Sequence, residues 1–203
     1  MQEPKLIALD CDDVLLNYNH AWGDMYTKYF NLPKFTTPIN PKAYYAAEYW
    51  GIEWNDFKPE LQAFNKHFHH YGWRDMQALD GAIEATHILR DYGYKIFVVT
   101  RMPESGEKQR SDNLNELGFA FDSVIGTGHT TTHNPKKPFI EALNPEYFVD
   151  DLITNFLGIE SDTKFVWLDV GRIHEENEQL KDVHDIHHTH SNLFDFVTNV
   201  IKK

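Results

Sequence analysis

Short apolar runs alternate with stretches of helical spacing along most of the chain. Residues 5–10 form a brief apolar run closed by polar residues, which indicates a buried strand. At 82–90 apolar residues recur at helical spacing, and Gly93 follows where a helix would end. Further strands are expected at 95–100, 122–125, 147–149, 164–168 and near 183–187, and helices at 105–117, 137–143, 152–157 and after a cap at Ser191. This alternation predicts a three-layer α/β fold, a parallel sheet covered by helices on both faces.

Residues 17–79 interrupt this alternation. The segment is crowded with aromatic residues, shows few strand-like runs, and has two helical stretches at about 20–31 and 57–71, joined by a proline-bearing stretch. We therefore predict an α/β core made of residues 1–16 and 80–203 and a helical insertion at 17–79. The aromatic residues are expected mainly to form the core of the insertion, with a subset such as Tyr18, Trp22 or Tyr45 open to substrate contact.

Composition narrows the classes of function. The 203 residues carry 19 basic and 31 acidic groups, a net charge of −12 without a basic run, which disfavours a nucleic acid polymer as partner. A small anionic substrate stays compatible with this charge because a bound cation can reverse the local field. No apolar run reaches the roughly 18 residues of a membrane span, and the N-terminus is unlike a secretory signal. Cys11 is the single cysteine, so a cytoplasmic protein without an intrachain disulfide is expected.

Polar residues gather where the predicted strands end. Asp10, Cys11, Asp12 and Asp13 follow the first strand, Thr100 and Arg101 follow another, and Asp150 and Asp151 follow a third, while Lys136 and Lys137 start a helix upstream of that last pair. The carboxyl ends of parallel strands share one edge of a sheet, so these groups are expected to meet there. Several carboxylates on one spot need a divalent cation, and oxygen ligands favour Mg²⁺.

These residue types suit phosphoryl transfer. Asp10 can attack phosphorus and form an aspartyl-phosphate, and Asp12 can protonate the leaving oxygen and then deprotonate water. Thr100 and the backbone amides around 11–13 are expected to hold the phosphate oxygens, and Lys137 is expected to stabilise their charge. The same region would bind Mg²⁺ and a small phosphorylated metabolite.

The ordered set resembles the haloacid dehalogenase-like hydrolase superfamily. The matching features are a strand ending in Asp10-x-Asp12, a strand ending in Thr100, Lys137 followed by proline, and a strand ending in Asp150-Asp151. The resemblance covers 1–16 and about 80–203 and implies a Rossmann-like core, with 17–79 as a cap that closes over the site and selects substrate.

Roles for single residues follow from the resemblance. It implies Asp10 as nucleophile and Mg²⁺ ligand, and Asp12 as acid/base with its carbonyl on the metal. Thr100 would bind phosphate, Lys137 would orient it, and Asp151 would ligate Mg²⁺ directly, with Asp150 acting through water or as a support. Dehalogenases of the family lack an acid at the place of Asp12, so a phosphatase or mutase is favoured.

Several alternatives stay open at this level. Asp13 stands where many members have glycine, Arg101 is either a phosphate contact or a surface residue, and Lys137 is preferred over Lys136 because proline follows it. Histidines at 67–70 and 184–190 are read as exposed polar residues in preference to transition-metal ligands. The predicted function is Mg²⁺-dependent hydrolysis of a small phosphomonoester. The rivals are a phosphomutase and a non-catalytic binding or regulatory protein of the same fold.

Overall fold

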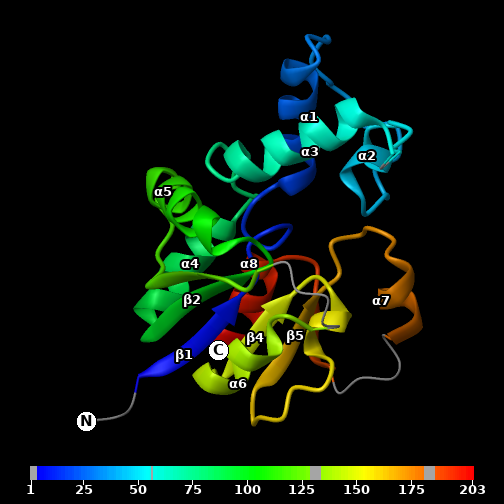
Figure 1. Cartoon of the computed structure of the whole chain (residues 1–203). Coiled ribbons are helices and arrows are strands. Elements are labelled where there is room, and N and C mark those ends of the chain that lie inside the picture. The colour runs from blue at the N-terminus through cyan, green and yellow to red at the C-terminus, as the bar shows by residue number, and fades with distance from the viewer. Residues whose placement is uncertain (1–3, 56, 129–133, 181–185) are drawn as a thin grey trace.

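A computed structural model describes residues 4–55, 57–128, 134–180 and 186–203. It contains one six-stranded parallel sheet in the order β3-β2-β1-β4-β5-β6 (Figure 1). The strands are β1 (Lys5–Leu9), β2 (Tyr94–Thr100), β3 (Ser123–Gly126), β4 (Tyr147–Asp150), β5 (Lys164–Leu168) and β6 (Ile186–His190). β1 lies between β2 and β4, with Leu9 opposite Val98 on one side and Val149 on the other. The order turns at β1, which makes its carboxyl end a place where ligands bind in such sheets.

Helices cover both faces of the sheet, as predicted. Ile7 and Leu9 of β1 pack in one apolar cluster with α4 (Ala82–Asp91) and α8 (Leu193–Phe196). Ala8, between them, points to the other face and packs in a second cluster with Ile140 of α6 (Lys137–Leu143). Both faces of β1 are therefore buried, which explains its continuous apolar sequence. α5 (Glu107–Leu117) precedes β3 and completes the core helices described here.

The segment 17–79 is helical, as predicted, in the residues that the structure describes. It contains α1 (Tyr18–Tyr29), α2 (Ala46–Tyr49) and α3 (Pro59–Tyr71), which lie together beyond the carboxyl end of β1 (Figure 1). Trp22 of α1 and Phe64 of α3 hold the group together, their ring centroids 5.2 Å apart in an edge-to-face contact. Phe64 and Phe68 are fully buried, so part of the aromatic content forms the core of the insertion.

Some element boundaries differ from the sequence-based expectation. The helix expected at 152–157 is a 3₁₀ turn over Ile153–Phe156, and the last helix is capped by Asn192 instead of Ser191. Its α-helical turn continues as a π-helix over Val197–Ile201. The strand expected near 183–187 is β6, which begins at Ile186; residues 183–185 lie outside the described part. α2 and α7 (Glu175–Leu180) were not predicted, because both are short and carry no clear apolar period.

None of the helices in the described ranges combines the length and the apolar character needed to cross a membrane.

Candidate active site

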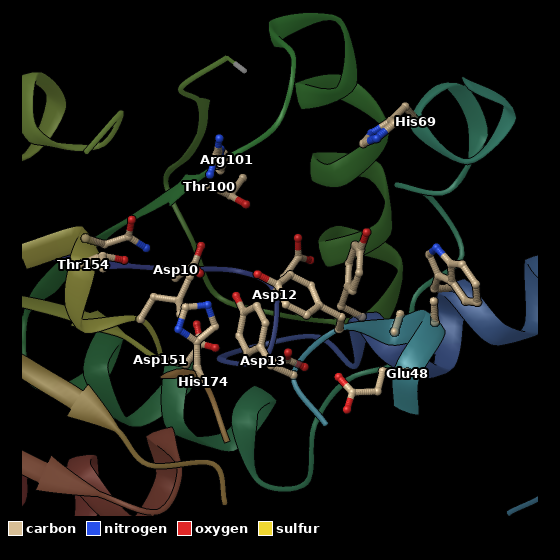
Figure 2. A pocket seen from close by; sticks show the side chains of 18 of the residues that line it. Asp10, Asp12, Asp13, Glu48, His69, Thr100, Arg101, Asp151, Thr154 and His174 are labelled. Carbon is tan, nitrogen blue, oxygen red and sulfur yellow. The ribbon is translucent and has the colours of Figure 1, made fainter. Parts of the chain in front are cut away.

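The predicted site residues of the first, second and fourth strands meet at one edge of the sheet. Asp10 follows β1 directly, and its amide continues the ladder to β4 by donating to the Val149 carbonyl at 2.9 Å. Thr100 ends β2 and Asp150 ends β4, so the two neighbours of β1 bring these side chains to either side of Asp10. Figure 2 shows Asp10, Thr100 and Asp151 around the same space. Parallel pairing in register is sufficient to cause this convergence.

Three carboxylates form a tight cluster there. One oxygen each from Asp10, Asp150 and Asp151 lie within 4.8 Å of one another, and all three residues are buried. Burial, reinforced by the charge of Asp150, holds the pKa of Asp151 well above its ordinary value. Buried carboxylates this close repel one another unless a cation lies among them. A hard divalent cation such as Mg²⁺ fits this all-oxygen donor set.

The two acids of the pair have different surroundings. Asp150 Oδ1 accepts hydrogen bonds from the Leu152 amide and from Asn155 Nδ2, both at 2.9 Å, and Oδ2 accepts from Lys136 at 2.7 Å. Both carboxylate oxygens of Asp150 therefore already accept hydrogen bonds from the protein. The Asp151 carbonyl accepts from the side chains of Trp167 and Asn177, which orients the backbone next to the cluster. Asp10 and Asp151 are the carboxylates best placed to hold Mg²⁺.

The prediction that Lys137 is the lysine of the site is wrong, because its neighbour Lys136 occupies the site. Its Nζ lies 2.7 Å from Asp10 Oδ1 and 2.7 Å from Asp150 Oδ2, and its side chain is 1% exposed. Burial alone would lower the pKa of Lys136, but the two carboxylates raise it, so the residue is a cation. Lys137 points outward, where its Nζ donates to the Gly158 carbonyl and lies 3.3 Å from Glu141.

Helix geometry explains this difference. Consecutive residues at the start of a helix point in directions about 100° apart, so only one of two adjacent lysines can face the sheet edge. Asn134 holds the turn by accepting hydrogen bonds at 3.1 Å from the amides of both Lys136 and Lys137. The proline after Lys137 marks the beginning of α6 but does not identify the inward lysine.

Asp12 has a buried cationic partner that the sequence analysis missed. Arg110 of α5 is 0% exposed and its Nη2 lies 2.7 Å from Asp12 Oδ1. The same guanidinium lies over the Trp73 ring at 5.2 Å, and Nη1 contacts Met76 Sδ. Burial raises the pKa of Asp12, and Arg110 partly opposes this. A carboxyl group with a raised pKa in a fixed position suits general acid catalysis.

A signal for Arg110 was present in the sequence. The segment of α5 has only Leu114 and Leu117 as apolar residues, so the inward face of a helix in this position had to include polar groups. Arg110 lies four residues before Leu114, on the same face.

Asp13 adopts a left-handed backbone conformation, with φ of 61°. Glycine adopts this conformation without strain, and aspartate is one of the few other residues that tolerates it. The Asp13 carboxylate pairs with Arg172, which follows β5 and lies 5.7 Å from the Tyr49 ring. Burial raises the pKa of Asp13 to about 7, with Arg172 opposing this shift. Asp13 is thus a buried, paired side chain, and Arg172 is a second partner missed from the sequence.

The other predicted residues have mixed outcomes. Thr100 is buried and lines the cavity; Arg101 is an exposed residue that also lines it, and its contact with phosphate stays a prediction. Cys11 is fully buried, which agrees with a spacer role, and burial raises the pKa of its thiol. The Asp13 amide donates to the Leu16 carbonyl at 2.8 Å, so this amide is not available to a phosphate. The histidines of the described ranges do not form a metal-ligating group, and His184 lies outside those ranges.

A cavity of about 920 Å³ extends from the carboxylates to the insertion. Its lining combines two groups of residues: a floor from the core, with Asp10, Asp12, Asp13, Asp151 and Lys136, and a wall of aromatic residues from the insertion. The loop after β5 contacts the insertion directly: Ile173 donates its amide to the Lys42 carbonyl at 2.8 Å, and the His174 ring meets Tyr44 edge-on at 4.4 Å. Figure 2 shows His174 beside Asp151 at this floor.

The fold defines a class of protein: a doubly wound parallel α/β sheet with a helical insertion after the first strand and acidic residues at the ends of its central strands. A scan of the sequence against models of protein families gives no match, and a search of curated proteins gives none either. Similarity to known proteins is therefore found in the structure and not in the sequence.

Solved structures of haloacid dehalogenase-like proteins have the same fold. A HAD family hydrolase from Deinococcus radiodurans R1, solved with bound phosphate and sodium, has a TM-score of 0.61 at 15% identity over 98% of this chain and 95% of that chain. A predicted phosphoglycolate phosphatase from Haemophilus somnus 129PT has a TM-score of 0.60 at 18% identity, with both chains fully covered. A defluorinating L-2-haloacid dehalogenase has 0.61 at 8% identity, over 98% of this chain and 95% of that chain. The chain therefore has the haloacid dehalogenase-like fold, and the similarity extends through the insertion.

Proposed function

We propose that the chain is a Mg²⁺-dependent hydrolase of small phosphomonoesters that acts through an aspartyl-phosphate on Asp10. The observation that carries this proposal is the position of Asp10, which lies in a three-carboxylate cluster, next to the buried Lys136 ammonium, two residues before the half-buried acid Asp12. Solved proteins of the same fold include phosphatases and dehalogenases. Fold similarity alone does not choose between these reactions, so the choice rests on Asp12 and its surroundings.

The proposed first step is attack of an Asp10 carboxylate oxygen on phosphorus. The bond between phosphorus and the leaving oxygen breaks, and Asp12 transfers its proton to that oxygen. In the second step water attacks the phosphorus of the aspartyl-phosphate, gives its proton to Asp12, and displaces Asp10 with release of inorganic phosphate. Mg²⁺, held by Asp10 and Asp151, would supply positive charge to the phosphate oxygens.

Other residues of the chain support these steps. Lys136 would stabilise the negative charge of the phosphate oxygens and orient the Asp10 carboxylate, because the pair lies in a buried environment where charge interactions are strong. Thr100 would donate to a phosphate oxygen. Arg110 would hold the Asp12 carboxyl in one orientation, with Oδ1 engaged, so that its other oxygen faces the cavity for proton transfer.

Phosphate release tests the proposal. We expect release from a panel of small phosphomonoesters with Mg²⁺, loss of release with a chelator, and loss with Asp10→Asn. Asp12→Asn should impair release from poor leaving groups most, because these need protonation. Asp24→Asn, at an exposed residue paired with Lys34, is the matched control and should retain activity. Full activity of Asp10→Asn would refute the mechanism.

Two rival functions give different results in the same assay. A phosphomutase would isomerise a sugar phosphate and release little phosphate, because its aspartyl-phosphate is transferred to a second hydroxyl. A binding or regulatory protein would bind phosphate esters without turnover. Release of halide from haloacids, in place of phosphate, would assign the chain to the dehalogenases.

A further inference from the structure

We infer that the cavity selects phosphomonoesters whose leaving group carries a flat aromatic or heteroaromatic ring and no second anionic group. This inference rests on the proposed function, because it takes the phosphate end to lie at Asp10. It derives from the two walls of the cavity, which differ in chemistry. The floor carries the acidic groups and Lys136, whereas the insertion contributes aromatic rings and almost no charge.

The structure divides the aromatic residues of the insertion into two sets. Phe64 and Phe68 are fully buried and form the core of the insertion, and Trp22, 5% exposed and stacked on Tyr26, belongs to this core while one side of it lines the cavity. A second set lines the cavity closer to its open side, with Tyr44 and Trp54 half-buried and Tyr45 65% exposed. Trp54 also packs edge-on against Trp22 of the core, with 5.8 Å between the ring centroids, whereas Tyr45 contacts Tyr44 and His174 at the margin of the insertion. A ligand ring can contact the second set in the bound state.

The second set is held close to the predicted reaction centre. Residues 42–45 are anchored on the loop after β5 by the Ile173 amide and by the contact between Tyr44 and His174. Tyr44 meets the His174 ring, and His174 lies beside Asp151 (Figure 2), so Tyr44 lies close to the acidic cluster. A group bound to a phosphate at Asp10 would therefore extend along Tyr44 towards Tyr45 and Trp54.

Charge determines what else that group can carry. Apart from the histidine His69, Glu48 is the one charged residue that the insertion contributes to the lining among the described residues. The basic residues of the lining are Arg101 and Lys136, both from the core, and Lys136 is already paired with Asp10 and Asp150. Arg101 directly follows Thr100 and lies at the phosphate end of the cavity, so a carboxylate or second phosphate placed along the insertion would meet Glu48 with no lysine or arginine of the insertion in the lining. Such substrates are therefore selected against.

The cavity volume agrees with a ring-bearing substrate. About 920 Å³ lies in the range of sites that enclose ligands of drug-like size. Phosphate esters of two-carbon or three-carbon acids would leave most of this space to water. A ring stacked on the aromatic wall would fill it and bury apolar surface on both partners.

Four compounds separate the effect of the ring from that of the charge. Uridine 5′-monophosphate has a ring without a second anion, orotidine 5′-monophosphate adds a carboxylate to the same ring, ribose 5-phosphate has no such ring, and phosphoglycolate has a carboxylate and no ring. We expect kcat/KM for uridine 5′-monophosphate to exceed that for each of the other three by about tenfold or more, from stacking and from absence of repulsion. Phenyl phosphate and pyridoxal 5′-phosphate then show whether the ring is preferred close to the phosphate or beyond a sugar.

Matched variants test the two walls. Trp54→Ala and Tyr45→Ala should lower the ratio of kcat/KM between uridine 5′-monophosphate and ribose 5-phosphate about tenfold, while ribose 5-phosphate itself changes by less than about threefold. Glu48→Lys should raise the ratio of orotidine to uridine 5′-monophosphate about tenfold. Tyr71→Ala and Glu160→Lys, at exposed residues outside the cavity lining, are the controls and should leave both ratios unchanged.

The outcomes distinguish this inference from the proposed function. Asp10-dependent phosphate release without preference for the ring, or with preference for phosphoglycolate, would overturn the inference and leave the proposed function intact. Equal changes in the cavity variants and in their controls would also overturn it. Absence of release from all the compounds would overturn both.

Discussion

Replacing Lys136 with methionine removes a buried ammonium that lies between two buried carboxylates. Its Nζ is 2.7 Å from Asp10 and 2.7 Å from Asp150, and the three side chains are 1%, 10% and 0% exposed. At an effective dielectric constant of about 20, two unit charges at this separation attract by about 6 kcal/mol. Much of this attraction offsets the cost of taking the charges out of water. The measurable effect is the penalty for leaving the carboxylates unpaired, about 3–5 kcal/mol.

Lys136→Met is therefore expected to lower the free energy of unfolding by about 3–5 kcal/mol, measured by urea denaturation in the presence of a chelator. Phosphate release should fall about 100-fold or more, because a preorganised charge next to the phosphate is lost. Lys137→Met is the matched control. Its side chain is 38% exposed and its pair with Glu141 is on the surface, so we expect a loss below about 1 kcal/mol and nearly unchanged activity.

The reasoning would be refuted if the two variants lost the same stability, or if Lys137→Met lost the activity and Lys136→Met retained it. A Lys136→Arg variant separates charge from shape. It keeps a cation between the carboxylates, so it should be more stable than Lys136→Met even where the larger guanidinium reduces activity.

Three further predictions concern the other charges. Asp151→Asn should leave the metal-free protein at least as stable as the wild type, because it removes one of three crowded carboxylates. The variant should not show the rise in melting temperature that Mg²⁺ causes in the wild type, and a retained rise would exclude Asp151 as a ligand. Arg110→Met should cost about 3–5 kcal/mol of stability by leaving the Asp12 carboxyl, which is 23% exposed, without its partner. Arg110→Lys should be intermediate, and equal urea midpoints for wild type and both variants would contradict this prediction. Although partial burial opposes it, the Arg90 guanidinium and the Ile96 amide lower the pKa of Asp122. Its carboxylate therefore stabilises the fold at pH values above the unfolded pKa of about 4. Asp122→Asn should be less stable than wild type by up to about 1 kcal/mol at pH 7. The two proteins should be equally stable once the pH falls below the folded pKa, and denaturation at both pH values measures this.

Much of the core was predictable from local pattern. The apolar runs of β1, β2, β4 and β5 and the helical spacing of α4 are each sufficient to identify the element, because strands buried on both faces and amphipathic helices have distinct periods. β6 was harder to predict, since it lies at the edge of the sheet, alternates between exposed and half-buried residues, and carries three histidines. α2 is a single turn without a side-chain cap, so its sequence gives little signal.

Asp10 and its neighbours were predictable for a topological reason. Parallel strands in register bring their carboxyl ends to one edge, so acids that follow apolar runs had to converge there. The partners of these acids were not predictable in the same way. Arg110 is 98 residues from Asp12 along the chain, and Arg172 is 159 residues from Asp13, so only the packing of α5 and of the loop after β5 brings the charges together.

The sequence by itself therefore determined the layers of the fold and the acids that follow its central strands, since the period of each strand and the residues after it are local properties. The tertiary structure alone decided which lysine faces the site, because adjacent residues of a helix start diverge by about 100°. It also decided which aromatic residues of the insertion are core and which face the cavity. That division depends on how the insertion lies over the carboxylates, and the inferred preference for a ring-bearing substrate rests on it.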